Sequence, residues 1–166
     1  MNTINKILIS CIILLIFTFS GINTSLAQKA SKEAVPVEDI LKSKKYQFRA
    51  EMVYPRGSIA KHLTTEYGLT ISNDSLTADL PYFGRAYTAP MNPAEAGIHF
   101  TATKFTYEMD NGRKKSWNVT IEPNGPGNEV RKILLTVFDN GKATLQVYSN
   151  DREPISYSGR LMKYDK

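Results

Sequence analysis

The stretch Leu80–Pro90, LPYFGRAYTAP, brings three aromatic rings and one arginine together within eleven residues. Tyr82, Phe83 and Tyr87 would form a rigid aromatic platform beside Arg85. Such a combination is enriched at recognition surfaces, because aromatic rings bury a large area at a small cost in side-chain entropy. These four residues are therefore the candidate binding residues of the chain.

The same stretch also suits a structural corner, and its composition favours this interpretation. Pro81 would end one strand, Gly84 would supply a bend, and Arg85 would hydrogen-bond to backbone carbonyls while the rings complete the core. Buried aromatic residues outnumber ligand-binding ones in small β domains. We expect the corner, with Tyr87 as the ring that stays partly exposed and available to a ligand.

Carboxylates offer a second chemistry. Glu108, Asp110 and Glu122 lie near the ends of predicted hairpins, and glycoside hydrolysis requires a pair of carboxyl groups. The sequence does not set the distances between these acids, and most acids so placed are solvated turn residues. A hydrolase that acts on polysaccharide through strand-end carboxylates is therefore the alternative to a binding module.

Residues that hold metals or cofactors do not cluster in the sequence. His62 and His99 have no cysteine and no carboxylate at a ligand spacing such as His-Glu-x-x-His. The glycine-rich segment Asn124–Gly127 has neither the lysine nor the following helix of a phosphate-binding loop. We predict no metal site and no cofactor.

Residues 1–27 have the three parts of a secretory signal peptide. Lys6 precedes an apolar run over residues 7–19, and Ser25-Leu26-Ala27 offers small residues at the two positions that a signal peptidase inspects. We predict cleavage before Gln28 and export to the periplasm or cell envelope.

Two alternatives to cleavage are an uncleaved anchor and a lipid-modified Cys11. The apolar run is shorter than the roughly 20 residues of a spanning helix, and most of it follows Cys11, whereas a lipoprotein signal places it before the cysteine. Cleavage is the better prediction, and it leaves no cysteine and no membrane span in the mature chain. It also removes Lys6, which lowers the net charge from +5 to +4. The remaining positive charges are scattered, which argues against a nucleic-acid partner.

The elements that must position these side chains are a tether, a helix and a sheet. Residues 28–35 are small and charged, which predicts a tether. Val37–Lys45 predicts one short helix that begins at Pro36, because its acids come early and its lysines late, as the helix dipole favours. Residues 36–166 are predicted to form a single antiparallel β domain that includes this helix.

Apolar and polar residues alternate from Tyr46 to Tyr54, which predicts a strand with Met52 and Tyr54 on the apolar face and Val53 on the polar face. Trp117 also falls on the apolar face of its strand, and we expect it in the core. Similar alternation recurs at residues 69–71, 76–80, 98–102, 105–109, 117–121, 143–147 and 155–161. The predicted fold class is mainly β, at the margin of α+β: a short N-terminal helix followed by a curved antiparallel meander of about seven to nine strands, sandwich or barrel-like.

Local features refine this meander. Asn111-Gly112 and Asn140-Gly141 each lie between two strands, and both pairs suit a type I′ hairpin. A β-bulge is expected between Ala102 and Phe105, where the alternation slips by one residue. Ile133–Phe138 is apolar on both faces, which predicts the most deeply buried strand.

Four blocks of sequence carry a resemblance to a known family: Pro81–Tyr87, Leu135–Phe138, Asn140-Gly141 and Pro154–Gly159. Together they resemble the exported Bacteroidetes family catalogued as domain of unknown function 4251, and the resemblance extends over about residues 46–161. It implies a Bacteroidetes host and an envelope location. The family brings no established activity, ligand or catalytic residue, so the resemblance assigns no functional residue here.

Small departures from the family pattern occur at Glu153 and at Glu95-Ala96-Gly97, and both fall in predicted loops. Bacteria of this group attach glycans to the serine or threonine of Asp-Ser/Thr-apolar tripeptides, and Asp74-Ser75-Leu76 matches this pattern. Ser75 is therefore a candidate O-glycosylation site, although an ordinary turn explains the same residues. The function itself is unknown from the sequence. The favoured hypothesis is a non-enzymatic envelope module that binds a small amphipathic ligand, a glycan or an envelope protein.

Overall fold

The computed structural model describes residues 35–87, 97–125 and 129–164. They form one helix and nine strands that share a core. The predicted signal peptide, residues 1–27, lies outside the described residues, as does all of the predicted tether except Val35. Within the described part of the chain, no helix is long and apolar enough to cross a membrane.

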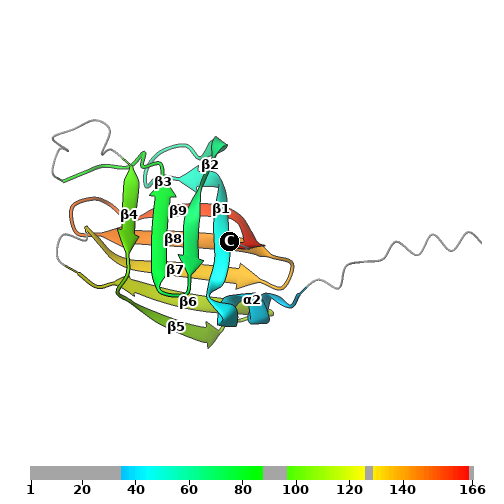
Figure 1. Ribbon diagram of the computed structural model, residues 1–166. Helices are drawn as coiled ribbons and strands as arrows, with labels where there is room; N and C mark the ends of the chain where they lie inside the picture. Colours follow the sequence, from blue (N-terminus) through cyan, green and yellow to red (C-terminus); the bar gives the residue numbers. More distant parts are fainter. Residues whose placement is uncertain (1–34, 88–96, 126–128, 165–166) are drawn as a thin grey trace, which may run out of the picture. The chain divides into compact units, whose positions relative to one another are not determined.

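Helix α2 spans Val37–Ser43 and follows Pro36, as the sequence predicts. Its acids stand in the first turn and Lys42 in the last, which matches the direction of the helix dipole. The helix ends at Lys44, which has left-handed φ and ψ, and its buried residue Leu41 packs into the core. The short helix thus covers one end of the sheet (Figure 1).

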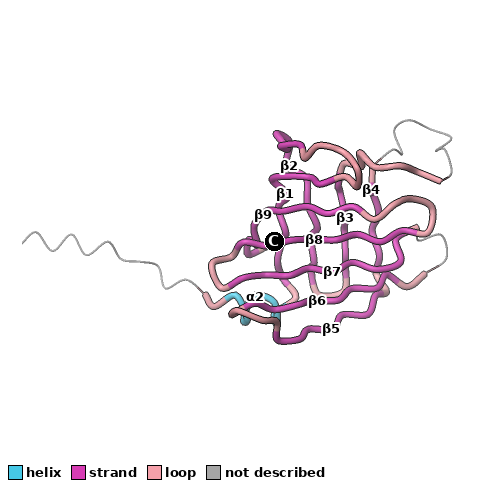
Figure 2. The backbone as a smooth tube through the Cα atoms, turned by 180° about the vertical axis from the view of Figure 1, so that it is seen from behind, coloured by secondary structure: helices cyan, strands magenta, loops and turns pink. Residues whose placement is uncertain are grey.

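All nine strands belong to one antiparallel sheet with the order β4-β3-β2-β1-β9-β8-β7-β6-β5. The strands are β1 Lys45–Tyr54, β2 Lys61–Ser72, β3 Ser75–Leu80, β4 Ile98–Ala102, β5 Phe105–Asn111, β6 Ser116–Pro123, β7 Val130–Phe138, β8 Lys142–Ser149 and β9 Ile155–Lys163. In Figures 1 and 2 the strands β1–β4 cross over the strands β5–β9. The predicted curved, antiparallel, mainly β fold is confirmed.

The sheet curls because its two edge strands follow one another in the chain. β4 and β5 lie at opposite ends of the strand order, yet only Thr103 and Lys104 separate them. The edges therefore meet at this connection, and the sheet becomes a nearly closed, barrel-like layer. The chain passes from one edge to the other here, so the β-bulge predicted between Ala102 and Phe105 is wrong: the slip in alternation marks a change of strand.

Two glycines flank the central strand β1 where the sheet bends. A Cβ atom at Gly68 would collide with the carbonyl oxygen of Phe48, and one at Gly159 would collide with that of Arg49. Glycine at such positions lets neighbouring backbones approach closely. Alternate residues of each strand point into the core that the sheet encloses, and Tyr46 is among the largest side chains buried there.

Because of a bulge in β1, the residues of this strand that face the core differ from those predicted. The pairing of β1 with both neighbours shifts between Ala50 and Met52. Beyond the shift Val53 is buried, whereas Tyr54 is 44% exposed. The prediction that Met52 and Tyr54 share the apolar face is therefore wrong, because one extra residue reverses the alternation.

The strand predicted to be buried on both faces is buried on one. Within β7 the alternate residues Ile133, Leu135 and Val137 are in the core, but Leu134 is half-buried and Phe138 is 37% exposed. The reason is that the sheet curls around its own core, and among the residues that the structure describes no second layer covers its outer face. Trp117 packs against the core as predicted, although it is only partly buried.

Neither Asn-Gly pair forms the predicted two-residue type I′ turn. After Asn111 the chain turns through four residues, with positive φ at Lys114 and Lys115. The second turn has three residues, and Gly141 takes the positive φ (+76°) while its N–H donates to the Phe138 carbonyl at 2.9 Å. Both turns still join antiparallel neighbours, so the predicted pairing of strands holds although the turn types do not.

Candidate functional site

The candidate residues of the stretch Leu80–Pro90 divide between interior and surface. Tyr82 is half-buried and packs against the core, whereas Phe83 is 42% and Tyr87 66% exposed. Arg85 is exposed as well. The expected partial exposure of Tyr87 is confirmed; its contact with a ligand remains a prediction. Residues 88–90 lie outside the described part of the chain.

Tyr82 acts as a structural anchor. The single proton of its hydroxyl is shared between two acceptors, the carbonyl oxygen of Arg85 at 2.8 Å and that of Glu153 at 3.0 Å. Burial is the main cause that raises the pKa of this hydroxyl, so it remains a protonated donor at neutral pH. Tyr82 therefore ties the corner to the segment that precedes β9.

Arg152, which the sequence analysis did not single out, is the centre of this corner. Its side chain is 8% exposed, and its guanidinium donates to the Gly97 carbonyl at 3.0 Å, to the Glu129 carboxylate at 2.7 Å and to Asp151 at 3.0 Å. It also lies 5.1 Å from the centre of the Tyr82 ring. Burial lowers the pKa of Arg152. Its hydrogen bond to Asp151 and the charges of Asp151 and Glu129 raise the pKa by more, so the net pKa lies above the ordinary value for arginine.

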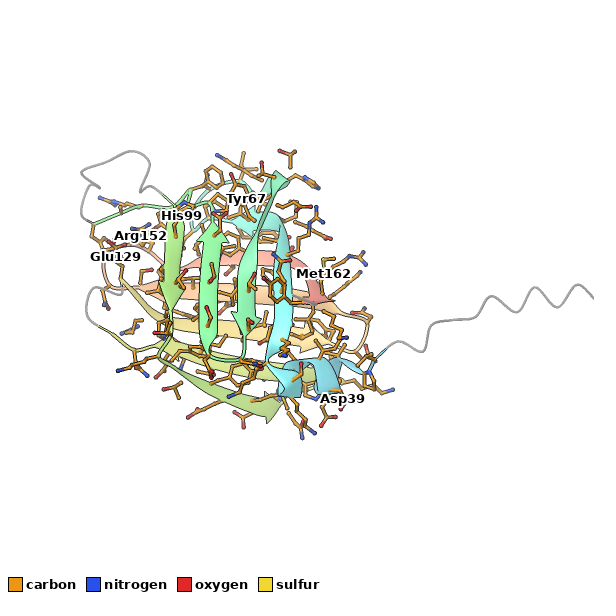
Figure 3. The ribbon with its side chains drawn as sticks, viewed as in Figure 1. Asp39, Tyr67, His99, Glu129, Arg152 and Met162 are labelled. Atoms are coloured by element: carbon orange, nitrogen blue, oxygen red, sulfur yellow. The ribbon has the colours of Figure 1, made fainter. Side chains whose placement is uncertain are left out.

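Arg152 joins four separate segments of the chain. It lies between β8 and β9 and contacts Glu129 before β7, Gly97 before β4 and the Tyr82 ring after β3. Figure 3 shows Arg152 and Glu129 together at one edge of the domain, near His99. Such buried, multiply bonded arginines hold loops in place. We name this arrangement of residues 81–87, 97, 129 and 151–153 the corner cluster.

Arg85 does not have the role that the corner hypothesis gave it. Its backbone belongs to the cluster, because the Arg85 carbonyl accepts a hydrogen bond from the Glu153 N–H at 3.0 Å. Its side chain, however, makes no hydrogen bond or ion pair with the residues that the structure describes. The carbonyls of the corner are satisfied by Tyr82 and Arg152 instead, so the predicted role of the Arg85 guanidinium is wrong.

The three candidate carboxylates of a hydrolase lie on the outer face of the sheet. In the strand register Glu108 is opposite Thr120, Asp110 is opposite Asn118, and Glu122 is opposite Thr106. Glu122 also pairs with Lys132 at 3.6 Å. Within the β5–β6 pair, each acid therefore lies opposite a neutral polar residue and not opposite a second acid.

Other candidate residues occupy separate positions. His62 lies on β2, and His99 pairs with Asp79 at 2.8 Å on the exposed face. In the described ranges, no group of three or more histidine, cysteine or acidic residues is placed to hold a metal. Ser75 begins β3 directly after the turn at Asn73 and is half-buried; its glycosylation remains a prediction.

A groove of about 410 Å³ lies on the outer face of the sheet, next to the corner cluster. It is lined by Tyr54, Arg56, Gln146, Tyr148, Pro154 and Ser156. The register places Tyr54, Ser156 and Gln146 in one row across β1, β9 and β8. Arg56 follows β1 in a turn, Pro154 directly precedes β9, and Tyr148 lies on β8; these three line the groove beyond that row. We name these six residues the outer groove.

The polar groups of the outer groove are only partly used by the protein. The Tyr148 hydroxyl donates to the Gln146 side-chain oxygen at 3.1 Å, and the Tyr54 hydroxyl lies 3.2 Å from that of Ser158. To the described residues, Arg56 and the Ser156 hydroxyl make no hydrogen bond. The groove therefore presents unused donors between two aromatic rings.

The corner cluster holds one wall of the outer groove. Glu153 bonds to Arg85 and Tyr82 through its backbone, and Pro154, the next residue, lines the groove. Arg152 forms an isolated β-bridge with Ala86, and its buried side chain fixes the same segment from the interior side. Residues 81–87 thus hold the edge of the groove in place.

The groove residues escaped the sequence analysis for identifiable reasons. Gln146 and Tyr148 lie on the polar face of their strand. An aromatic ring is unexpected on that face, so Tyr148 was the one sequence signal that could have indicated a site here. Tyr54 was assigned to the apolar face because the bulge in β1 cannot be read from alternation. The meeting of β1, β8 and β9 depends on strand order, which involves residues far apart in sequence.

The comparisons with known proteins agree with this fold. Residues 28–161 match the family described as Domain of unknown function (DUF4251). Among curated proteins, none matches this chain significantly. A solved structure of a DUF4251 family protein from Bacteroides eggerthii DSM 20697 is similar, with a TM-score of 0.56 and 16% sequence identity. That alignment covers 76% of this chain and 84% of that chain, and at such identity it supports the fold alone.

Proposed function

We propose a function for this chain, which belongs to the DUF4251 family: it is a non-enzymatic binding module of the cell envelope, and its ligand occupies the outer groove. The observation that carries this proposal is the groove itself, in which two tyrosine rings flank unused hydrogen-bond donors. Binding sites are typically concave, with aromatic walls and a few polar groups that fix orientation.

Binding is favoured over hydrolysis because acids and groove are separate. Among the described residues that line the groove, none is a carboxylate. Glu108 and Asp110 stand on the far strand β5, and Glu122 is engaged by Lys132. A glycosidase needs two carboxyl groups that face one bond of the substrate, and this arrangement offers a binding surface instead.

The envelope location rests on the sequence of residues 1–27. We propose that the signal is removed before Gln28 and that the mature protein is periplasmic. Intact-mass spectrometry of the exported protein tests this. A mass that includes residues 1–27, or a diacylglycerol on Cys11, would contradict it.

The binding proposal is tested by NMR titration of the ¹⁵N-labelled exported protein with three probes: maltohexaose, tri-galacturonic acid and decyl maltoside below its micelle concentration. At least one probe is expected to shift the amides of Tyr54, Gln146 and Ser156. Tyr148→Ala should weaken that binding, whereas the matched Tyr87→Ala, on the exposed side of the corner, should not.

Three results would contradict the proposal. Probe-induced shifts confined to residues 82–87 would move the site to the exposed rings of the corner. The absence of shifts in the groove with all three probes would remove the site altogether. Cleavage of either oligosaccharide, followed by chromatography, would favour the hydrolase, and Glu108→Gln and Glu122→Gln would then identify its acids.

A further inference from the structure

The lining of the outer groove offers several hydrogen-bond donors. Arg56 offers five N–H donors and a permanent positive charge. The Gln146 side-chain oxygen already accepts from Tyr148, which leaves its amide NH₂ group as a donor, and the Ser156 hydroxyl is available as well. A complementary ligand must therefore carry several acceptor oxygens.

The charge of the groove points in the same direction. Of the described side chains that line it, Arg56 is the one that is charged. Two other cations of the outer face are paired: Arg160 with Glu51 at 3.2 Å and Lys132 with Glu122 at 3.6 Å. An unpaired guanidinium beside neutral groups favours a carboxylate, which accepts two parallel hydrogen bonds from it.

The aromatic residues add a requirement for flat apolar surface. Tyr54 is 44% exposed, and Tyr148 lines the groove from β8, which is separated from the strand of Tyr54 by β9. Rings placed in this way bury apolar faces of a ligand at small entropic cost. The ligand must therefore combine a ring that has an apolar face with a rim of oxygen atoms.

We infer that the ligand of the outer groove is an acidic carbohydrate, a saccharide that bears a carboxylate. Its carboxylate binds Arg56, its hydroxyls accept hydrogen bonds from Gln146 and Ser156, and its ring faces cover the tyrosines. This inference rests on the proposed binding function and specifies its ligand class. A neutral sugar would leave the Arg56 charge unused, and a small anion without a ring would leave the tyrosines uncovered.

The test compares three probes by calorimetry and NMR at about 0.1 M salt, where charge interactions at this range still act. The probes are tri-galacturonic acid, its fully methyl-esterified form and citrate. The acid is expected to bind about tenfold more tightly than the ester, the gain typical of one charged hydrogen-bonded contact. Citrate, which has carboxylates but no ring, should not shift the groove amides.

The variants separate charge from general binding. Arg56→Gln should abolish the tenfold preference, because it should weaken binding of the acid much more than binding of the ester, whose carbonyl carries no charge. The matched Arg113→Gln, an exposed arginine at the opposite end of the domain, should retain the full preference. Tyr148→Ala should weaken the acid and the ester equally, because it removes a ring contact that both share.

Several outcomes would overturn the inference. Equal affinity for the acid and the ester, equally strong citrate shifts in the groove, or loss of the preference in Arg113→Gln would each do so. If decyl maltoside alone shifts the groove amides, the groove binds an amphiphile: the ligand class is then wrong and the binding function stands. If no probe shifts them, both fail.

Discussion

The corner cluster and the outer groove each combine an arginine with tyrosines, yet they use these side chains in opposite ways. In the corner cluster the Arg152 side chain is 8% exposed and bonds to Gly97, Glu129 and Asp151. In the outer groove Arg56 is exposed and has no partner among the described residues. Whether such a set of residues serves folding or binding depends on whether the protein's own backbone satisfies the donors.

The two regions are also adjacent, because the segment 151–156 belongs to both. Its first half pairs with residues 85–87, and its second half lines the groove with Pro154 and Ser156. Substitutions in the corner cluster should therefore lower the free energy of unfolding and also weaken binding in the groove. Substitutions in the groove should weaken binding alone. Four stability measurements sharpen or break this comparison.

The largest effect is expected for Arg152→Met. The substitution leaves the Gly97 carbonyl and two carboxylates without their donor, and losing one partner of a buried ion pair is strongly destabilising. Because the Glu129 side chain is 63% exposed and can be rehydrated, we expect a loss of about 2 kcal/mol, below the usual range. Denaturation in urea measures it. Arg85→Met is the matched control and should change the free energy of unfolding by less than about 0.5 kcal/mol. A larger loss in Arg85→Met than in Arg152→Met would mean that the Arg85 side chain does hold the corner, as the sequence predicted.

Gly84→Ala should cost about 1.5 kcal/mol through overpacking. Gly84 does not have a positive φ, so the cost comes from steric contact and not from backbone strain. A Cβ atom at this position would lie 2.5 Å from the Tyr82 hydroxyl oxygen and 2.7 Å from the ring carbon that carries it. Thermal melts of Gly84→Ala, Tyr82→Phe and the double variant test this. Removing the hydroxyl should relieve part of the cost, so strictly additive effects would contradict the contact.

Tyr157→Phe should lower stability by about 1 kcal/mol at pH 7, because its hydroxyl donates to the Pro81 carbonyl at 2.8 Å. Burial raises the pKa of Tyr157 in the folded protein above its ordinary value of about 10. The folded state thus holds a proton that the unfolded chain releases, so this contribution is intact below pH of about 10 and declines above it, by up to about 1.4 kcal/mol per pH unit. Unfolding measured from neutral to alkaline pH should show a shallower decline in Tyr157→Phe. An identical decline would mean that Tyr46, whose pKa burial also raises, accounts for all of it.

The smallest effects are expected in the outer groove. Arg56→Gln and Tyr148→Phe remove groups that the described residues use little or not at all, and each should change the free energy of unfolding by less than about 0.5 kcal/mol. Urea denaturation of both variants beside Arg152→Met gives the direct contrast. A loss above about 1 kcal/mol in either variant would show that the groove is part of the structural framework.

The sequence by itself determined the local order of this protein. The helix over Val37–Ser43 follows from the position of its charges and of Pro36, and most strands follow from alternation of apolar residues. Both signals depend on residues that lie within one turn or one strand of each other. For the same reason the sequence placed Tyr82 at a corner: proline and glycine restrict or free the backbone locally.

Only the tertiary structure decided which side chains meet. The bulge that turns Tyr54 outward depends on the register of β1 with two neighbours. The choice of Arg152 over Arg85 depends on loops from four parts of the chain that converge at one edge of the sheet. The outer groove exists because β1, β9 and β8 are adjacent in the strand order. Pairing between distant strands is fixed by the closure of the whole sheet around its core, and no local pattern of residues carries that information.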